Sequence, residues 1–242
     1  ARTAAYSAET YYNYTIFLTG LTGILAMIPA LYFYRRDKVR RIAGGLIPAQ
    51  KKVPLSLLEI ILLLLAGAGL AQYGNFLMAI LQSFINSSAY QESMTRITEG
   101  KSLLMMIFWM GIIAPAAEEM IFRWLIYLRL RDWMKLPVAA VISGVVFGIY
   151  HVNIVQGIYA SILGTAFAWI LEMSGNIYSS MLLHMGANIW SLVITEYALD
   201  LFSMKYGVQI LILIYLILLA GVVCCLTHFE KVYSVRKKKR MI

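Results

Sequence analysis

The stretch SLLMMIFWMGIIAPAAEEMIFRWLIYL, residues 102–128, decides the fold of this chain. It exceeds the roughly 20 mostly apolar residues that a helix needs to cross a membrane. Near its middle stand two adjacent glutamates and an arginine, Glu118, Glu119 and Arg123. Each charged side chain at mid-membrane costs about 2.5–3.5 kcal/mol. We therefore predict a transmembrane helix whose charged residues face the protein interior and mark a functional site.

The composition extends this interpretation to the whole chain. Of its 242 residues, 61% are hydrophobic and 14% are charged, whereas soluble domains have about 45–50% apolar and about 25% charged residues. These values exclude a soluble globular protein and a disordered one. Seven stretches are apolar and long enough to count as spans: 14–34, 55–82, 102–128, 136–154, 156–172, 177–195 and 206–228. The sequence thus predicts an all-α, polytopic membrane helix bundle of about seven transmembrane helices, with eight as the alternative count.

We expect one transmembrane domain over residues 1–242, with a motif-bearing catalytic core at about 102–195. Three expectations concern local shape. The polar loop at about 83–101 should carry a short helix. Pro115 lacks a backbone N–H and should bend the third span close to the glutamates. The second span is long enough to tilt or break near its glycines, Gly67, Gly69 and Gly74.

The basic residues set the orientation of the bundle. Of 21 Lys and Arg residues, 16 fall between the first two spans, between the third and fourth spans, or in the C-terminal tail. By the positive-inside rule these segments are cytoplasmic, so the N-terminus lies outside and the C-terminus lies in the cytoplasm. The net charge of +9 then serves contact with anionic membrane lipids, and no nucleic-acid partner is expected. We predict an integral multi-pass protein of a bacterial cytoplasmic membrane, and the sequence indicates no oligomeric state.

The spacing of the three charged residues in the third span divides their roles. Glu119 and Arg123 are four residues apart, so they share one face of a helix and can form an ion pair. Glu118 lies about 100° around the helix from Glu119. One carboxylate is thus neutralised within its own helix, and the other is left to act as a base.

Two other spans carry polar residues at the same spacing. Phe147 and His151 are four residues apart in one span, and His184 and Asn188 are four residues apart in another. The pattern Gly144-x-x-x-Gly148 beside the first pair permits a close helix contact. A single polar cavity shared by three spans accounts for these residues together with the two glutamates and the arginine.

A carboxylate and an imidazole around a wet cavity can activate water, and a second imidazole with an amide can stabilise the oxyanion that follows. This combination predicts hydrolysis of a peptide or ester bond without a covalent intermediate. Zinc held by Glu118, His151 and His184 is the alternative mechanism, although no His-Glu-x-x-His motif is present. A non-catalytic membrane scaffold or immunity protein and a proton-coupled transporter are the alternatives outside the enzyme class.

The ordered motifs resemble those of the CPBP (Abi) intramembrane proteases, a family that includes the CAAX-processing Ras-converting enzyme and bacteriocin-processing proteins. The resemblance covers about residues 115–190 and rests on three motifs: Glu118-Glu119-x-x-x-Arg123, Phe147-x-x-x-His151 and His184-x-x-x-Asn188. It implies an α-helical membrane endopeptidase, favours a glutamate-type mechanism without a cofactor, and implies a hydrophobic or lipidated peptide or protein substrate.

The same resemblance implies a role for each motif residue. Glu118 would be the catalytic base, and His151 would help to hold the water. His184 and Asn188 would form the oxyanion site. The remaining motif residues would support this geometry, namely Glu119, Arg123 and Phe147.

Overall fold

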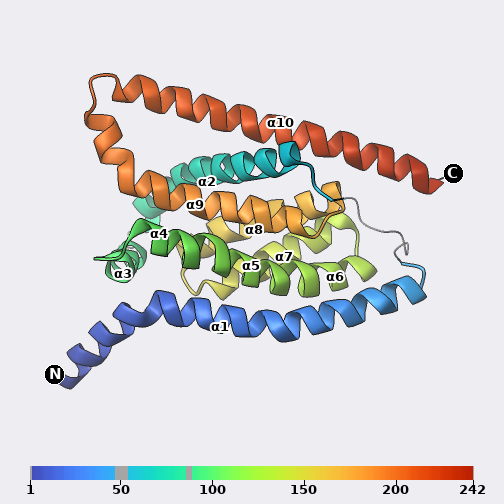
Figure 1. The fold of residues 1–242 in the computed structure, drawn as a ribbon, viewed down its shortest axis with the longest axis horizontal. Helices are drawn as coiled ribbons and strands as arrows, with labels where there is room; N and C mark the ends of the chain where they lie inside the picture. Colours follow the sequence, from blue (N-terminus) through green and yellow to red (C-terminus); the bar gives the residue numbers. More distant parts are fainter. Residues whose placement is uncertain (1, 47–53, 86–88, 242) are drawn as a thin grey trace.

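The computed structural model describes residues 2–46, 54–85 and 89–241, and within these ranges the chain is helical, with no strand (Figure 1). The helices, in chain order, are α1 (Arg2–Ala43), α2 (Leu57–Ile85), α3 (Ala89–Thr98), α4 (Leu103–Met106), η1 (Ile107–Ile113), α5 (Ala114–Glu119), η2 (Met120–Tyr127), α6 (Leu128–Trp133), α7 (Leu136–Tyr150), α8 (Ile154–Ser174), α9 (Tyr178–Ser203) and α10 (Gly207–Met241). The segments α4 to α6 follow one another without a break and form one long rod. The all-α fold is therefore confirmed.

Local signals in the sequence set several helix ends. At the start of α2, Ser56 and Glu59 form a capping box, in which the Ser56 N–H donates to the Glu59 carboxylate at 2.8 Å. The side chain of Asn153 caps α8 by accepting from the N–H of Gln156 at 3.0 Å. At the other end of α8, Gly175 adopts a left-handed φ of 67°, which a residue without Cβ takes without strain.

Five helical segments in the described part of the chain have the length and composition of membrane spans: Tyr14–Ala43, Leu57–Phe84, Leu103–Trp133, Ile154–Ser174 and Gly207–Lys238. The helix α7 is apolar but shorter, and α9 is not among the five. Each of the seven predicted stretches falls on one helix or on the α4–α6 rod, and α3 lies in the loop where a short helix was expected. A polytopic membrane protein is thus indicated, while the count of seven crossings stays a prediction.

Of the two outcomes expected for the second span, the break is not present, because α2 runs as one helix through all three glycines, and the tilt stays a prediction. A Cβ on Gly67 would lie 2.9 Å from the backbone nitrogen of Ala187 and would also meet the carbonyl of Leu183 on α9. A Cβ on Gly69 would lie 2.8 Å from the carbonyl oxygen of Leu218 on α10. These glycines therefore let α2 pack tightly between α9 and α10 (Figure 1).

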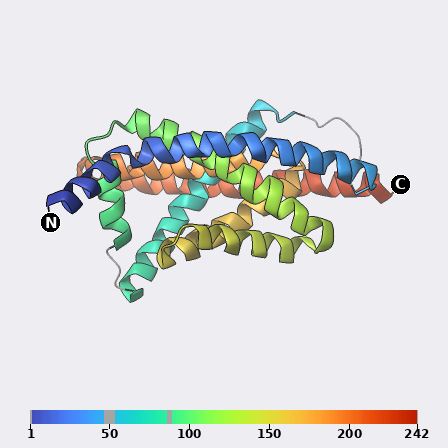
Figure 2. The ribbon, with the colours of Figure 1, turned by 90° about the horizontal axis from the view of Figure 1, so that it is seen from below.

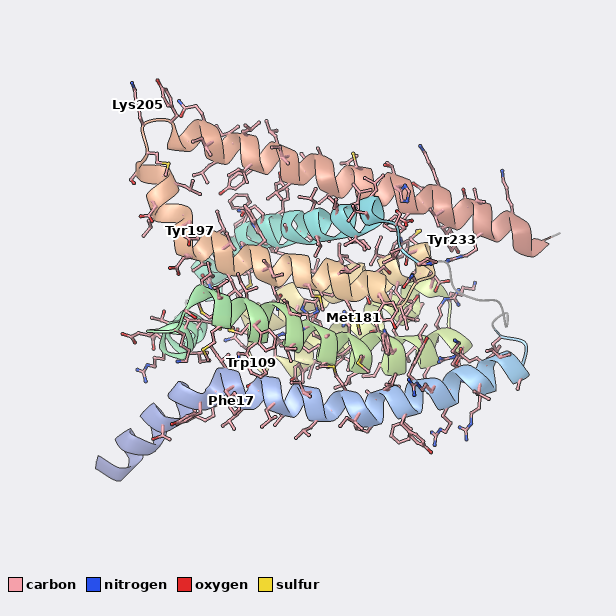
Figure 3. The ribbon with its side chains drawn as sticks, viewed as in Figure 1. Phe17, Trp109, Met181, Tyr197, Lys205 and Tyr233 are labelled. Carbon is pink, nitrogen blue, oxygen red and sulfur yellow. The ribbon has the colours of Figure 1, made fainter. Side chains whose placement is uncertain are left out.

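Oppositely charged side chains join the helices at one end of the bundle. Nε of Arg41 lies 2.8 Å from Oδ2 of Asp132, which ties α1 to α6. Arg131 on α6 pairs with Glu172 on α8 at 3.3 Å, and Arg236 on α10 donates to the Glu172 carbonyl. Figure 3 shows nitrogen-tipped side chains gathered at this end, near Tyr233 and opposite Lys205. The basic segments thus meet at one end of the molecule, as their alternation with the spans predicted.

The helices α7 and α8 form a close hairpin with an uncharged sequence. No Asp, Glu, Lys or Arg occurs in residues 136–171. Cβ atoms on Gly144 and Gly148 would strike the backbone of α8, so the expected close contact at this motif is confirmed. Figure 2 shows α7 at the edge of the molecule, away from α1. With 15 residues, α7 is about 22 Å long, which is less than the roughly 30 Å hydrocarbon core of a bilayer.

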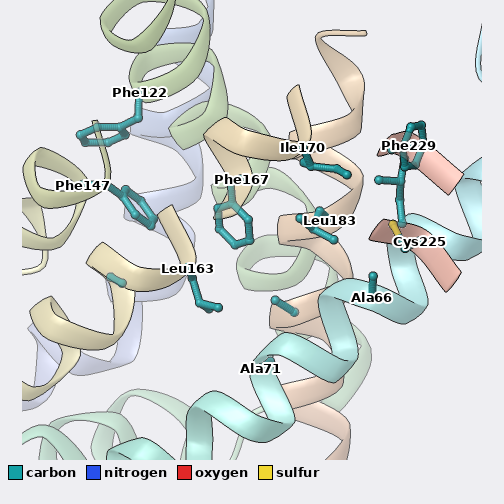
Figure 4. Packing of buried hydrophobic residues seen from close by; sticks show 13 residues of the cluster. Ala66, Ala71, Phe122, Phe147, Leu163, Phe167, Ile170, Leu183, Cys225 and Phe229 are labelled. Atoms are coloured by element: carbon teal, nitrogen blue, oxygen red, sulfur yellow. The ribbon is translucent and has the colours of Figure 1, made fainter. Parts of the chain in front are cut away.

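Buried apolar side chains from six segments form the main core (Figure 4). Its aromatic members are Phe122 on η2, Phe147 on α7, Phe167 on α8 and Phe229 on α10. Smaller residues from α2 and α9 complete it, including Ala66 and Leu183. This core surrounds the polar groups described below, so the same packing that holds the bundle together also positions the candidate site.

Replacing Gly67 by alanine tests the close approach of α2 and α9. The added methyl would collide with backbone atoms that cannot move aside, so we expect Gly67→Ala to lower the free energy of unfolding by about 1–3 kcal/mol. Gly221→Ala is the control, because its Cβ would lie 3.2 Å from the Cβ of Leu65 and alanine is the better helix former. Thermal unfolding in detergent measures both, and equal midpoints for the two variants would contradict the prediction.

Candidate active site

The rod of residues 103–133 contains two wide helical turns, one on each side of the glutamates. The N–H of Ala114 donates to the carbonyl of Trp109, and the N–H of Leu128 donates to that of Arg123, each five residues back. Such π-helical turns are frequent at functional sites. A π-helical segment ends at Ile113, two residues before Pro115, and the bend expected at this proline stays a prediction. Glu118 stands fifteen residues from either end of the 31-residue span Leu103–Trp133, which is mid-membrane for a spanning helix.

Glu119 is fully buried and has two cationic or polar partners. Its Oε1 lies 3.2 Å from Nη1 of Arg123 and 3.1 Å from Nδ1 of His184. Neither Glu119 nor Arg123 is exposed at all. The predicted pair four residues apart is therefore present, and it joins the rod to α9 through His184.

Two phenyl rings enclose the guanidinium of Arg123. Its central carbon lies 4.6 Å from the ring centre of Phe147 and 5.3 Å from that of Phe167. Gly164 on α8 leaves the space that the side chain needs, because a Cβ there would lie 2.7 Å from Nη2 of Arg123. Cation–π contact of this kind is worth about 2 kcal/mol when desolvated, so the rings help to offset the burial of the charge.

His184 stands between the two glutamates. The Glu119 carboxylate is ion-paired and accepts, so Nδ1 of His184 carries the proton of their hydrogen bond. Nε2 of the same ring lies 3.7 Å from Oε2 of Glu118. That distance is longer than a hydrogen bond, and the Glu118 side chain is 20% exposed. Glu118 and His184 Nε2 are thus close together while each remains available to a third group.

His151 lies at the tip of the α7–α8 hairpin, where it ends α7. Its Nδ1 is 2.9 Å from the carbonyl oxygen of Phe147. A carbonyl only accepts, so Nδ1 carries the proton and Nε2 is left as an acceptor. The next residue, Val152, has a φ of 55°, which a β-branched residue rarely adopts. The tight turn at Val152 therefore fixes the position of His151 at the C-terminal end of α7.

Phe147 connects His151 with the buried part of the site. Its ring meets the His151 ring edge-on at 4.8 Å and the His184 ring edge-on at 5.6 Å. The same ring underlies Arg123. The structure thus brings Glu118, Glu119, Arg123, His184 and Phe147 into one cluster, and it attaches His151 to that cluster through Phe147.

Asn188 is half-buried and is held by a backbone group. Its side-chain nitrogen donates to the carbonyl of Met110 at 3.0 Å. In a π-helical turn that carbonyl would accept from the residue five positions later, which is Pro115 and has no N–H to give. Asn188 supplies the missing donor with one N–H and keeps a second N–H. Its link to the rod is therefore a consequence of the proline.

Among the residues that the structure describes, no group of three or more His, Cys, Asp and Glu side chains is arranged to hold a metal ion. Nε2 of His184 lies 3.7 Å from Oε2 of Glu118, and Nε2 of His151 remains an acceptor because its Nδ1 bonds to the carbonyl of Phe147.

The helical bundle, with its five segments long and apolar enough to span a membrane, indicates a polytopic membrane protein, and its buried carboxylate–imidazole cluster lies halfway along one of these segments. More particularly, residues 100–190 match the family model of the Rce1-like type II CAAX prenyl endopeptidases. This range contains all three motifs, so the match confirms the resemblance to the CPBP proteases and indicates a membrane protease. Neither a curated protein nor a solved structure matches the chain.

Sequence reasoning missed two contributors to this cluster. Phe167 carried no signal in the sequence, because a phenylalanine within an apolar span is ordinary core. The carbonyl of Met110 had one signal, namely its position five residues before Pro115. The catalytic roles of Glu118, His151, His184 and Asn188 stay predictions.

Removing Arg123 tests how much the buried pair contributes. Arg123→Leu leaves the Glu119 charge buried beside His184 alone, and we expect a loss of about 3–5 kcal/mol in the free energy of unfolding. The double variant Arg123→Leu/Glu119→Gln removes both charges and should recover much of that loss. Denaturant titration in detergent compares the variants, and a double variant no more stable than Arg123→Leu would contradict the expectation.

The link between Asn188 and Pro115 predicts a rescue. Asn188→Ala leaves the Met110 carbonyl without its donor and should cost about 1–3 kcal/mol. Pro115→Ala in that background returns a backbone N–H to the rod, so the double variant should unfold at a higher temperature than Asn188→Ala. Circular dichroism at rising temperature follows this directly. Additive losses from the two substitutions would show that the proline and the asparagine are independent.

Proposed function

We propose that the protein is an intramembrane endopeptidase in which Glu118 activates water to hydrolyse a peptide bond. The observation that carries this proposal is the division between two adjacent carboxylates. Glu119 is fully buried and tied to Arg123 and His184, whereas Glu118 is partly exposed and faces His184 Nε2 across 3.7 Å. A structural carboxylate and a reactive one thus stand side by side.

In the first step, Glu118 takes a proton from water while the water oxygen attacks the carbonyl carbon of the scissile bond. Nε2 of His151 accepts the hydrogen bond of the second water hydrogen, because its Nδ1 already donates to Phe147. The water is then oriented by one acceptor and deprotonated by another.

In the second step, the tetrahedral intermediate needs donors for its oxyanion. The remaining N–H of Asn188 would be one, and a proton on Nε2 of His184 would supply the other. Collapse breaks the carbon–nitrogen bond, and Glu118 returns its proton to the leaving amine. Proton count and charge are then restored for the next cycle.

The position of the site favours a hydrophobic or lipidated peptide or protein as substrate. Glu118 lies halfway along a membrane span, where a polar segment would pay a large desolvation cost. The family matched by residues 100–190 is described by its action on CAAX prenyl substrates, so a lipid-modified tail is the first candidate. We propose that the end of the bundle that carries the basic segments faces the cytoplasm of a bacterial cell.

The expected result for Glu118→Gln is a loss of cleavage of about 100-fold or more, because the amide keeps the shape of the side chain but takes no proton. New peptide termini in membranes that contain candidate substrates, counted by mass spectrometry, measure it. Glu59→Gln is the matched control, since Glu59 is paired with Ser56 and His228 at an end of α2. Its termini should equal those of the wild type.

A chelator arm separates the two mechanisms. Termini that require Glu118 and survive the chelator support the glutamate-type reaction. Termini that disappear with chelator and return with zinc support the metalloprotease alternative. Equal termini from the wild type and Glu118→Gln across several membrane sources would overturn the proposal and favour a non-catalytic scaffold or immunity protein.

A further inference from the structure

Phe167 stands closer to the imidazole of His184 than any motif residue's ring does. The two ring centres are 4.6 Å apart and their planes differ by 26°, which is a stacked arrangement. Phe167 is fully buried on α8, and Figure 4 shows its ring between Phe147 and Leu183. The imidazole therefore has a flat partner along its face as well as a charged partner at Nδ1.

A single hydrogen bond does not fix the plane of a histidine. The torsion that turns the ring about its bond to Cβ has broad minima, so the hydrogen bond from Nδ1 to Glu119 limits the ring plane only to the range of angles that this bond tolerates. A rotation within that range shifts both ring nitrogens, including Nε2 beside Glu118. The stacked face of Phe167 opposes this movement, and the edge contact of Phe147 at 5.6 Å restricts it from another side.

The ring of Phe167 also contacts the group that holds Glu119. The guanidinium carbon of Arg123 lies 5.3 Å from its centre. The ring thus touches His184 directly and touches the cation that orients the acceptor of His184.

We infer that Phe167 is a positioning residue that sets the plane of the His184 ring and so aims Nε2 toward Glu118. The catalytic part of this inference rests on the proposed function. The part that concerns the orientation of the ring rests on contact geometry alone. The motif pattern does not contain Phe167, and its contribution is made through His184 without contact with the reacting atoms.

The plainer interpretation is that Phe167 only fills the core, and Phe229 offers a matched control for it. Phe229 belongs to the same apolar cluster and is 1% exposed. Its ring contact is with His228 on α10, outside the site. Replacing either phenylalanine by leucine removes a similar volume from the core, and only one of the two substitutions removes the face beneath His184.

The kinetic test compares Phe167→Leu, Phe167→Tyr and Phe229→Leu as full-length protein in lipid nanodiscs. We expect Phe167→Leu to lower kcat about 10- to 100-fold, as a displacement of about 1 Å in a catalytic group does, with KM changed little. Phe167→Tyr keeps the aromatic face and should recover most of kcat. Phe229→Leu should lose comparable thermal stability while kcat stays close to that of the wild type.

A second readout does not depend on catalysis. In protein labelled with ¹⁵N-histidine, the slowly exchanging Nδ1 proton of His184 gives a signal that His184→Gln assigns by its disappearance. Phe167→Leu should broaden or abolish this signal, and Phe167→Tyr and Phe229→Leu should keep it. An unchanged signal in Phe167→Leu overturns the inference whatever the kinetics show.

The two readouts keep the failures distinguishable. If the wild type cleaves no substrate but Phe167→Leu abolishes the Nδ1 signal, the proposed function fails and the positioning role stands. If kcat falls equally in Phe167→Leu and Phe229→Leu, the loss reflects core packing, and the positioning role is overturned.

Discussion

The ion pair between Glu119 and Arg123 is the interaction on which the rest of the site depends. Both side chains are fully buried, and a buried charge without partners would cost several kcal/mol. The surrounding helices add contacts to the pair: rings from α7 and α8 beside the guanidinium and an imidazole from α9 at the carboxylate. Because each of these helices contributes one contact to a single charged pair, the pair determines how the three helices stand around the rod.

In the hydrocarbon core of a bilayer no water is present to bond a backbone polar group. A group that lacks its partner within the helix must therefore be hydrogen-bonded by another part of the protein. Pro115 leaves the Met110 carbonyl without a backbone donor, and the side chain of Asn188 on α9 donates to this carbonyl instead. Ser143 on α7 likewise donates to the carbonyl of Phe122 at 3.0 Å, within the second π-helical segment. The irregular turns of the rod are therefore stabilised by side chains from α7 and α9, and the irregularity is also what ties these helices to it.

The sequence predicted what depends on spacing along one helix, and it missed what depends on contacts between helices. The Glu119–Arg123 pair, the gathering of basic segments at one end and the tight contact at Gly144 and Gly148 all follow from local patterns. Of the tilt or break expected in α2, the break is absent, and the glycines instead allow close packing against helices that no local sequence pattern identifies. The stacking of Phe167 on His184 was equally hidden, since it arises where α8 and α9 meet.

The placement of both partners of the ion pair on one helix has a consequence for how the protein is made. A chain enters the membrane in order, and the rod precedes α7, α8 and α9. Since Glu119 and Arg123 neutralise each other one turn apart, two of the three charges in the middle of the rod are compensated before any other helix of the site exists. The α7–α8 hairpin that follows has no charged residue over 136–171. It therefore enters the membrane without the cost of burying a charge. During synthesis the guanidinium of Arg123 therefore has its partner Glu119 from the moment the rod enters the membrane.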